Sequence, residues 1–198
     1  MEKIEELLTA LHRDALAWCR GRRWWLRLPL TLFFAYIFVR HLASPDYQSL
    51  FKGLNLGIHE LGHFLFGLLG EFMSVAGGTL LQCLVPIGSV FMFLKQRDYY
   101  AITVSFGWLA TNLFGVATYA GDARTMELPL VSPGVGDIVH DWNYLLGKLG
   151  LLSADQTIAF LFRAGAVASM AVCLTGGAWV LWRMYRPVEP ESEEDLTP

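Results

Sequence analysis

Long apolar runs constrain this chain more than any other feature. Stretches at about residues 24–42, 50–69, 99–120 and 157–182 each reach the ~17–25 residues that a bilayer-spanning helix needs. Of the 198 residues, 54% are hydrophobic and only 17% are charged, which is low for a soluble domain. The sequence therefore predicts an all-α polytopic membrane protein with about four transmembrane helices.

The two ends of the chain differ from this apolar middle. Residues 1–23 place apolar side chains at helical spacing among charged ones, which predicts an amphipathic N-terminal helix on the membrane surface. Residues 24–186 form the expected membrane domain. Residues 187–198 are acidic and contain prolines at both ends, which is typical of a disordered tail. No basic stripe indicates nucleic acid. The expected partners are the lipid bilayer and a membrane-protein or peptide substrate, and a homo-oligomer or larger membrane complex stays open.

The segment Phe72–Leu94 is long enough to cross, but Gly77-Gly78 and Pro86-Ile87-Gly88 interrupt it. If it instead enters and returns as a re-entrant hairpin, three basic clusters share one side of the membrane. These clusters are Arg20 to Arg27, Lys95 with Arg97, and Arg183 with Arg186. Basic residues favour the cytoplasmic side. We therefore predict a hairpin, four full spans and cytoplasmic termini, in a bacterial inner membrane.

The second apolar run contains the motif His59-Glu60-Leu61-Gly62-His63. Residues four apart lie on one face of a helix, so the two imidazoles can bind one zinc ion (Zn²⁺) while Glu60 acts as a general base. The alternative is that these three residues match the motif by chance and are only hydrogen-bonded polar residues of the core. Each ionisable side chain near mid-bilayer costs at least ~2.5 kcal/mol on insertion scales, which favours a metal site.

The order of these features resembles the site-2 protease family of intramembrane zinc metallopeptidases. The motif is followed by the Gly-rich segment "GGTLLQCLVPIG" and later by "FGWLATNLFG" around Asn112. The resemblance covers about residues 53–142. It implies an intramembrane zinc metalloendopeptidase with His59 and His63 as ligands, Glu60 as the base and Asn112 as a candidate substrate-binding residue.

The third metal ligand is less clear from the sequence. The family takes an aspartate from a motif ending in Asp-Gly, and this chain has no Asp-Gly pair. The stretch "SPGVGDIVHDW" offers His140, which we predict as the ligand because three histidines form an established zinc set. Asp137 and Asp141 are the alternatives, either as the ligand or as supports for one.

Two other functions stay open at this point. The first is a non-catalytic membrane subunit that keeps the zinc-peptidase scaffold for packing or partner binding. The second is a membrane di-iron protein, because Glu60-x-x-His63 and Asp137-x-x-His140 imitate the carboxylate–histidine pairs of di-iron bundles. A di-iron site normally takes two further carboxylates, and no span offers an obvious pair.

Overall fold

The computed structural model describes residues 2–44, 46–129 and 140–186, and over these residues the chain is helical without any strand. Three one-turn 3-10 helices connect longer α-helices: η1 (Trp24–Leu26), η2 (Gly67–Leu69) and η3 (Leu152–Ala154). The α-helices are α1 (Glu2–Cys19), α2 (Leu28–Ala43), α3 (Lys52–Phe66), α4 (Glu71–Gln96), α5 (Tyr99–Gly121), α6 (Asp141–Leu149) and α7 (Asp155–Tyr185). The predicted all-α class is confirmed. The expected disordered tail lies outside the described residues.

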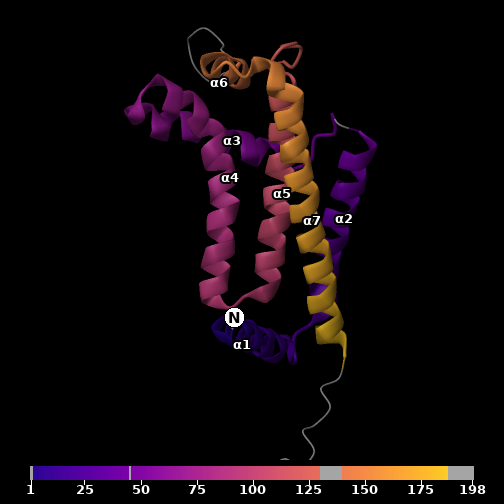
Figure 1. Cartoon of the computed structure of the whole chain (residues 1–198). Coiled ribbons are helices and arrows are strands. Elements are labelled where there is room, and N and C mark those ends of the chain that lie inside the picture. Colours follow the sequence, from indigo (N-terminus) through magenta and orange to yellow (C-terminus); the bar gives the residue numbers. More distant parts are fainter. Residues whose placement is uncertain (1, 45, 130–139, 187–198) are drawn as a thin grey trace, which may run out of the picture.

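Four helices form the body of the molecule. Figure 1 shows α2, α4, α5 and α7 running side by side, with α1 across the end where the chain begins and α6 across the opposite end. Three segments of the described chain are long and apolar enough to cross a membrane, namely Glu71–Gln96, Tyr99–Gly121 and Leu152–Tyr185. Helix α2 is also apolar but shorter, at 16 residues.

The core lies around α5, which packs closely against α7. Small side chains allow this approach: Ala110, Ala117 and Ala120 are all buried on α5. At Gly107, an added methyl group would lie 2.7 Å from the Phe34 ring of α2. Because α5 is held from several sides, it is a rigid support for whatever packs at its ends.

The predicted hairpin at residues 72–94 does not occur, because this segment lies inside the single 26-residue helix α4. Gly77 and Gly78 serve a close helix contact rather than a turn, since α3 packs directly onto them. Pro86 lies inside the helix and is buried. Proline is tolerated at such positions in membrane helices because neighbouring groups compensate for the lost hydrogen bond.

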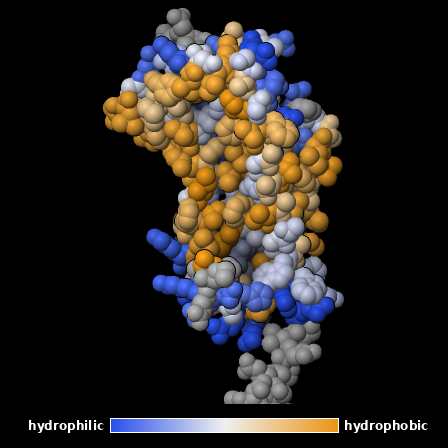
Figure 2. Space-filling view, in the orientation of Figure 1, coloured by the Kyte–Doolittle hydropathy of each residue, from blue (hydrophilic) through white to orange (hydrophobic). Residues whose placement is uncertain are grey.

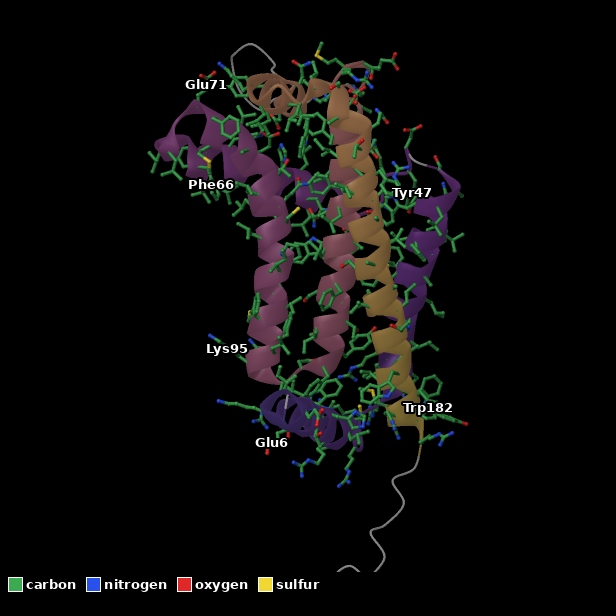
Figure 3. The ribbon with its side chains drawn as sticks, in the orientation of Figure 1. Glu6, Tyr47, Phe66, Glu71, Lys95 and Trp182 are labelled. Atoms are coloured by element: carbon green, nitrogen blue, oxygen red, sulfur yellow. The ribbon has the colours of Figure 1, made fainter. Side chains whose placement is uncertain are left out.

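Helix α3 does not run parallel to the other long helices. Figure 1 shows α3 crossing the bundle near the α6 end instead of running along it. The predicted grouping of the basic clusters is nevertheless present: Figure 3 shows Lys95 and Trp182 at the same end as Glu6 of α1, with Glu71 at the other end. The sequence prediction placed residues 50–69 along the bundle, whereas the structure places α4 along it and α3 across it. The basic residues lie at one end in either arrangement.

Candidate metal centre

Glycines bring α3 and α4 into direct backbone contact at the motif. A Cβ at Gly62 of α3 would clash with the Gly77 carbonyl oxygen of α4. A Cβ at Gly78 would lie 2.6 Å from Nε2 of His59. The expected close approach at Gly62 therefore involves the backbone of α4. This close approach buries His59 between α3 and α4.

Three side chains converge at this crossing: His59 and His63 from α3, and Asp141 from the start of α6. Oδ2 of Asp141 lies 2.9 Å from Nε2 of His59 and 3.3 Å from Nε2 of His63. Donors bound tetrahedrally to zinc at ~2.0 Å lie about 3.3 Å apart. Among the described residues, this is the one group of three histidine, cysteine or acidic side chains close enough to hold a metal ion.

The far nitrogens of both imidazoles are held by acceptors. Nδ1 of His63 donates to the backbone carbonyl of Ser74, 2.9 Å away, and Nδ1 of His59 lies 2.9 Å from Oε1 of Gln82. A carbonyl can only accept, so a neutral His63 has its lone pair on Nε2, facing Asp141. Metal-binding histidines are oriented by such bonds. The donor set therefore fits a divalent cation.

The carboxylate and the imidazoles influence each other's charge. The hydrogen bond to Asp141 raises the pKa of His63 above its ordinary value, although burial acts in the opposite direction. Burial by itself raises the pKa of Asp141, but hydrogen bonds from His59 and from the protonated form of His63 outweigh it, and the net pKa is lowered. Asp141 is therefore an anionic donor at neutral pH, as a metal ligand must be.

Glu60 lies beside the three donors without being one of them. Its side chain is half-buried and close enough to His63 and Tyr119 to act on both electrostatically. Within the part of the chain that the structure describes, it has no hydrogen bond or ion pair. A general base needs a carboxylate that is near the reacting atoms and free to accept a proton, and Glu60 meets both conditions.

Helix α5 fixes the position of Asp141. The backbone N–H of Asp141 donates to the hydroxyl of Tyr119, 3.0 Å away. Asn143, in the first turn of α6, donates its amide to the carbonyl of Ala123 at 2.8 Å. At the other end of the site, Asn55 of α3 accepts from Trp108 of α5 at 2.8 Å. Contacts with the same rigid helix, α5, thus fix the positions of the donors on both α3 and α6.

His140, the predicted third ligand, is not among the converging donors. Its Nδ1 accepts from the N–H of Asn143 and so caps α6, while its Nε2 lies 3.3 Å from Oδ2 of Asp122. Asp141, the alternative ligand, takes the place expected for His140, and Asp137 lies outside the described residues. Asn112 is buried in α5, where it donates to the carbonyl of Trp108.

Sequence reasoning did not single out Asp122, Gln82 or Tyr119. Asp122 follows α5 and accepts from the backbone of Glu127 and Leu128 as well as from His140. Burial alone raises the pKa of Asp122, but a hydrogen bond from the Thr125 hydroxyl together with these bonds lowers it overall. Gln82 could have been identified from the sequence, because a buried amide in the middle of an apolar helix needs a hydrogen-bond partner. No sequence pattern pointed to Asp122 or Tyr119.

The link from Asp122 to His140 predicts the effect of replacing His140. His140→Asn keeps a good helix cap but removes the link, so Asp141 is held less firmly. We expect zinc affinity to fall by about 10–100-fold, the usual effect of losing an outer contact to a metal site. Competition titration with a chelator measures this. His12→Asn on the exposed face of α1 is the control, and complete loss of zinc in His140→Asn would identify His140 as a ligand instead.

The contact at Gly78 predicts opposite results for two alanines on one helix. Gly78→Ala is expected to push the His59 imidazole away, lowering stability by about 1–3 kcal/mol and weakening metal binding. Gly88→Ala meets nothing within 4 Å and should leave both unchanged or slightly raise stability. Thermal unfolding and metal content of the purified variants test the pair. Equal behaviour of the two would refute a tight crossing at His59.

Comparisons with family models, curated proteins and solved structures found no match to this chain. The class therefore follows from the molecule itself. Over the residues that the structure describes, it is a helical protein with three segments long and apolar enough to cross a membrane. Among these residues, His59 and Asp141, both buried, and the half-buried His63 form a cluster beside Glu60.

Proposed function

We propose that this protein is an intramembrane zinc metalloendopeptidase that hydrolyses peptide bonds of membrane-embedded substrates. The observation that supports it most directly is the convergence of His59, His63 and Asp141 next to Glu60. Three protein donors leave a fourth zinc position open, which is the arrangement of catalytic rather than structural zinc sites. The donor set also matches the two histidines and one aspartate that the resemblance to the site-2 protease family implies.

Each residue has a distinct task in this proposal. A bound zinc ion would supply Lewis acidity and lower the pKa of a water molecule. Glu60 accepts a proton from the attacking water and transfers it to the nitrogen of the leaving amine. Ser74 and Gln82 keep the imidazoles oriented through their Nδ1 atoms. Tyr119 holds the N–H of Asp141, so the carboxylate stays in line with both histidines.

The proposal includes a topology. Helices α2, α4, α5 and α7 are the four spans, and α3 lies across them. Because the basic clusters gather at the α1 end, this end faces the cytoplasm, with both termini on that side. A bacterial inner membrane is the proposed location.

The other two functions have less support. The di-iron reading needs Asp137 and His140 as its second pair, but His140 bonds to Asp122 and Asp137 lies outside the described residues. A non-catalytic subunit would keep the same donors, so only an assay separates it from the enzyme.

That assay uses the purified chain in vesicles with a single-span substrate. Cleavage should stop when a chelator removes the metal and return when zinc is added. A protein that binds zinc but never cleaves would be the non-catalytic subunit.

A further inference from the structure

An apolar arm projects from the bundle next to the metal centre. It consists of residues 61–76: the end of α3, η2 and the first turns of α4 (Figure 1). Leu68 is 93% exposed and Phe64 79% exposed. The other exposed large apolar side chains of the arm are Leu61, Leu65, Leu69 and Phe72. Monomeric soluble surfaces rarely leave such a group uncovered.

The surroundings of the arm indicate what covers it. Figure 2 shows its apolar surface continuing without a break onto the side of α4, while hydrophilic residues gather at both ends of the molecule. Along α4, the exposed side chains Leu80, Leu84, Ile87 and Phe91 extend this surface towards the basic end. Because α4 is long and apolar enough to cross a membrane, the same acyl chains that cover α4 extend over the arm.

Helix lengths give the depth of the centre. His59 touches α4 at Gly78, and Lys95 near the end of α4 lies at the basic end. These positions are 17 residues apart, or about 26 Å along a helix. On α5, Tyr119 beside Asp141 is 21 residues from the cap Asp98, or about 32 Å. The hydrocarbon core is ~30 Å thick. Both helices place the centre near the boundary far from the basic end, and not at the mid-bilayer depth expected from the sequence.

We infer that the arm lies within the acyl chains along the membrane boundary opposite the basic end, and that the centre acts at this boundary. This position of the centre, taken together with the proposed function on which the inference rests, defines the substrate class. The substrates are membrane-anchored polypeptides, cut where the anchoring segment leaves the hydrocarbon core on that side. Water reaches this depth readily, whereas the mid-bilayer excludes it. The chain near the boundary also needs less helix unwinding than a central segment.

Spin-label depth measurements test the location without any activity. Single cysteines at Leu68, Leu84 and Leu149, in a variant with its three native cysteines replaced by alanine, carry nitroxides in phosphatidylethanolamine–phosphatidylglycerol vesicles. Leu84 lies 11 residues from Lys95, about 16 Å, so its label should be deepest. The Leu68 label should be exposed to oxygen and shallower than Leu84, and the Leu149 label on α6 should contact the aqueous nickel reagent.

Two spin-label results would overturn the inference. If the Leu68 label meets the nickel reagent as freely as the Leu149 label, the arm lies in water. If it is shielded from oxygen and nickel alike, the arm is covered by protein, such as a second copy of the chain.

Cleavage mapping tests the substrate class. Single-span substrates that carry the same helix-breaking sequence at stepped depths are incubated with the reconstituted enzyme, and the products are mapped by mass spectrometry. Cleavage should be fastest within about two turns of the boundary opposite the basic end. Fastest cleavage at the centre or at the basic side overturns the inference while the peptidase proposal stands. Absence of cleavage at every depth refutes both the inferred substrate class and the peptidase proposal. The spin-label measurement then still shows whether the arm lies within the acyl chains.

Discussion

Glu60→Gln is expected to abolish cleavage while the protein keeps its fold and its zinc. The amide cannot accept the proton of the attacking water, and loss of a positioned general base lowers rates by about 10²–10⁴-fold. Among the described residues, Glu60 makes no hydrogen bond or ion pair with the three donors, so the amide should leave their positions unchanged. The rate of substrate cleavage in vesicles and the zinc content of the same preparation are the two measurements.

The matched control is Glu71→Gln, an exposed glutamate at the start of α4 (Figure 3). It should cleave at close to the wild-type rate. If Glu60→Gln cleaves as fast as this control, Glu60 is not the base. If it loses zinc together with activity, Glu60 belongs to the donor set rather than beside it.

Asp141→Ala is expected to remove zinc binding. Two imidazoles alone form a poor site, and loss of the anionic donor should weaken affinity by more than the about 100-fold that an outer contact contributes. The N–H that donates to Tyr119 remains in the alanine variant. Helix α6 should therefore stay docked against α5. Metal analysis after gel filtration, with circular dichroism for helix content, measures both effects.

Asp98→Ala provides the comparison, because Asp98 caps α5 at the basic end by accepting from the N–H of Ala101. Its loss should lower stability by about 1 kcal/mol and leave zinc unchanged. Retention of full zinc by Asp141→Ala would contradict the donor set. Loss of zinc by both variants would indicate general destabilisation instead of a lost ligand.

The helices were predictable from the sequence because each apolar run is long and distinct. Which apolar run lies along the bundle and which lies across it was harder to predict. The positions of α3 and α4 depend on the contact of Gly62 with Gly77 and Gly78, and glycine pairs in a sequence suggest a turn as readily as a close helix crossing. Basic-residue counts could not separate the two arrangements, since both place the same clusters at one end.

His59, Glu60 and His63 were predictable because their spacing on one helix has a direct chemical reason. The third donor was not, since His140 and Asp141 are adjacent and point in different directions. Their directions depend on Asp122, which bonds to His140, and on Tyr119, which bonds to the backbone of Asp141. Both partners are distant in sequence and follow no local pattern.

X-ray absorption spectroscopy at the zinc edge, with metal quantification on the purified protein, tests the central claim most directly. We expect one zinc ion per chain, bound by two imidazoles and by oxygen donors at ~2.0–2.2 Å, with no sulfur in the coordination sphere. One imidazole fewer should be seen in His59→Ala or His63→Ala if any metal remains. A third imidazole in the spectrum, or wild-type protein without metal after zinc-supplemented purification, would contradict the proposed centre.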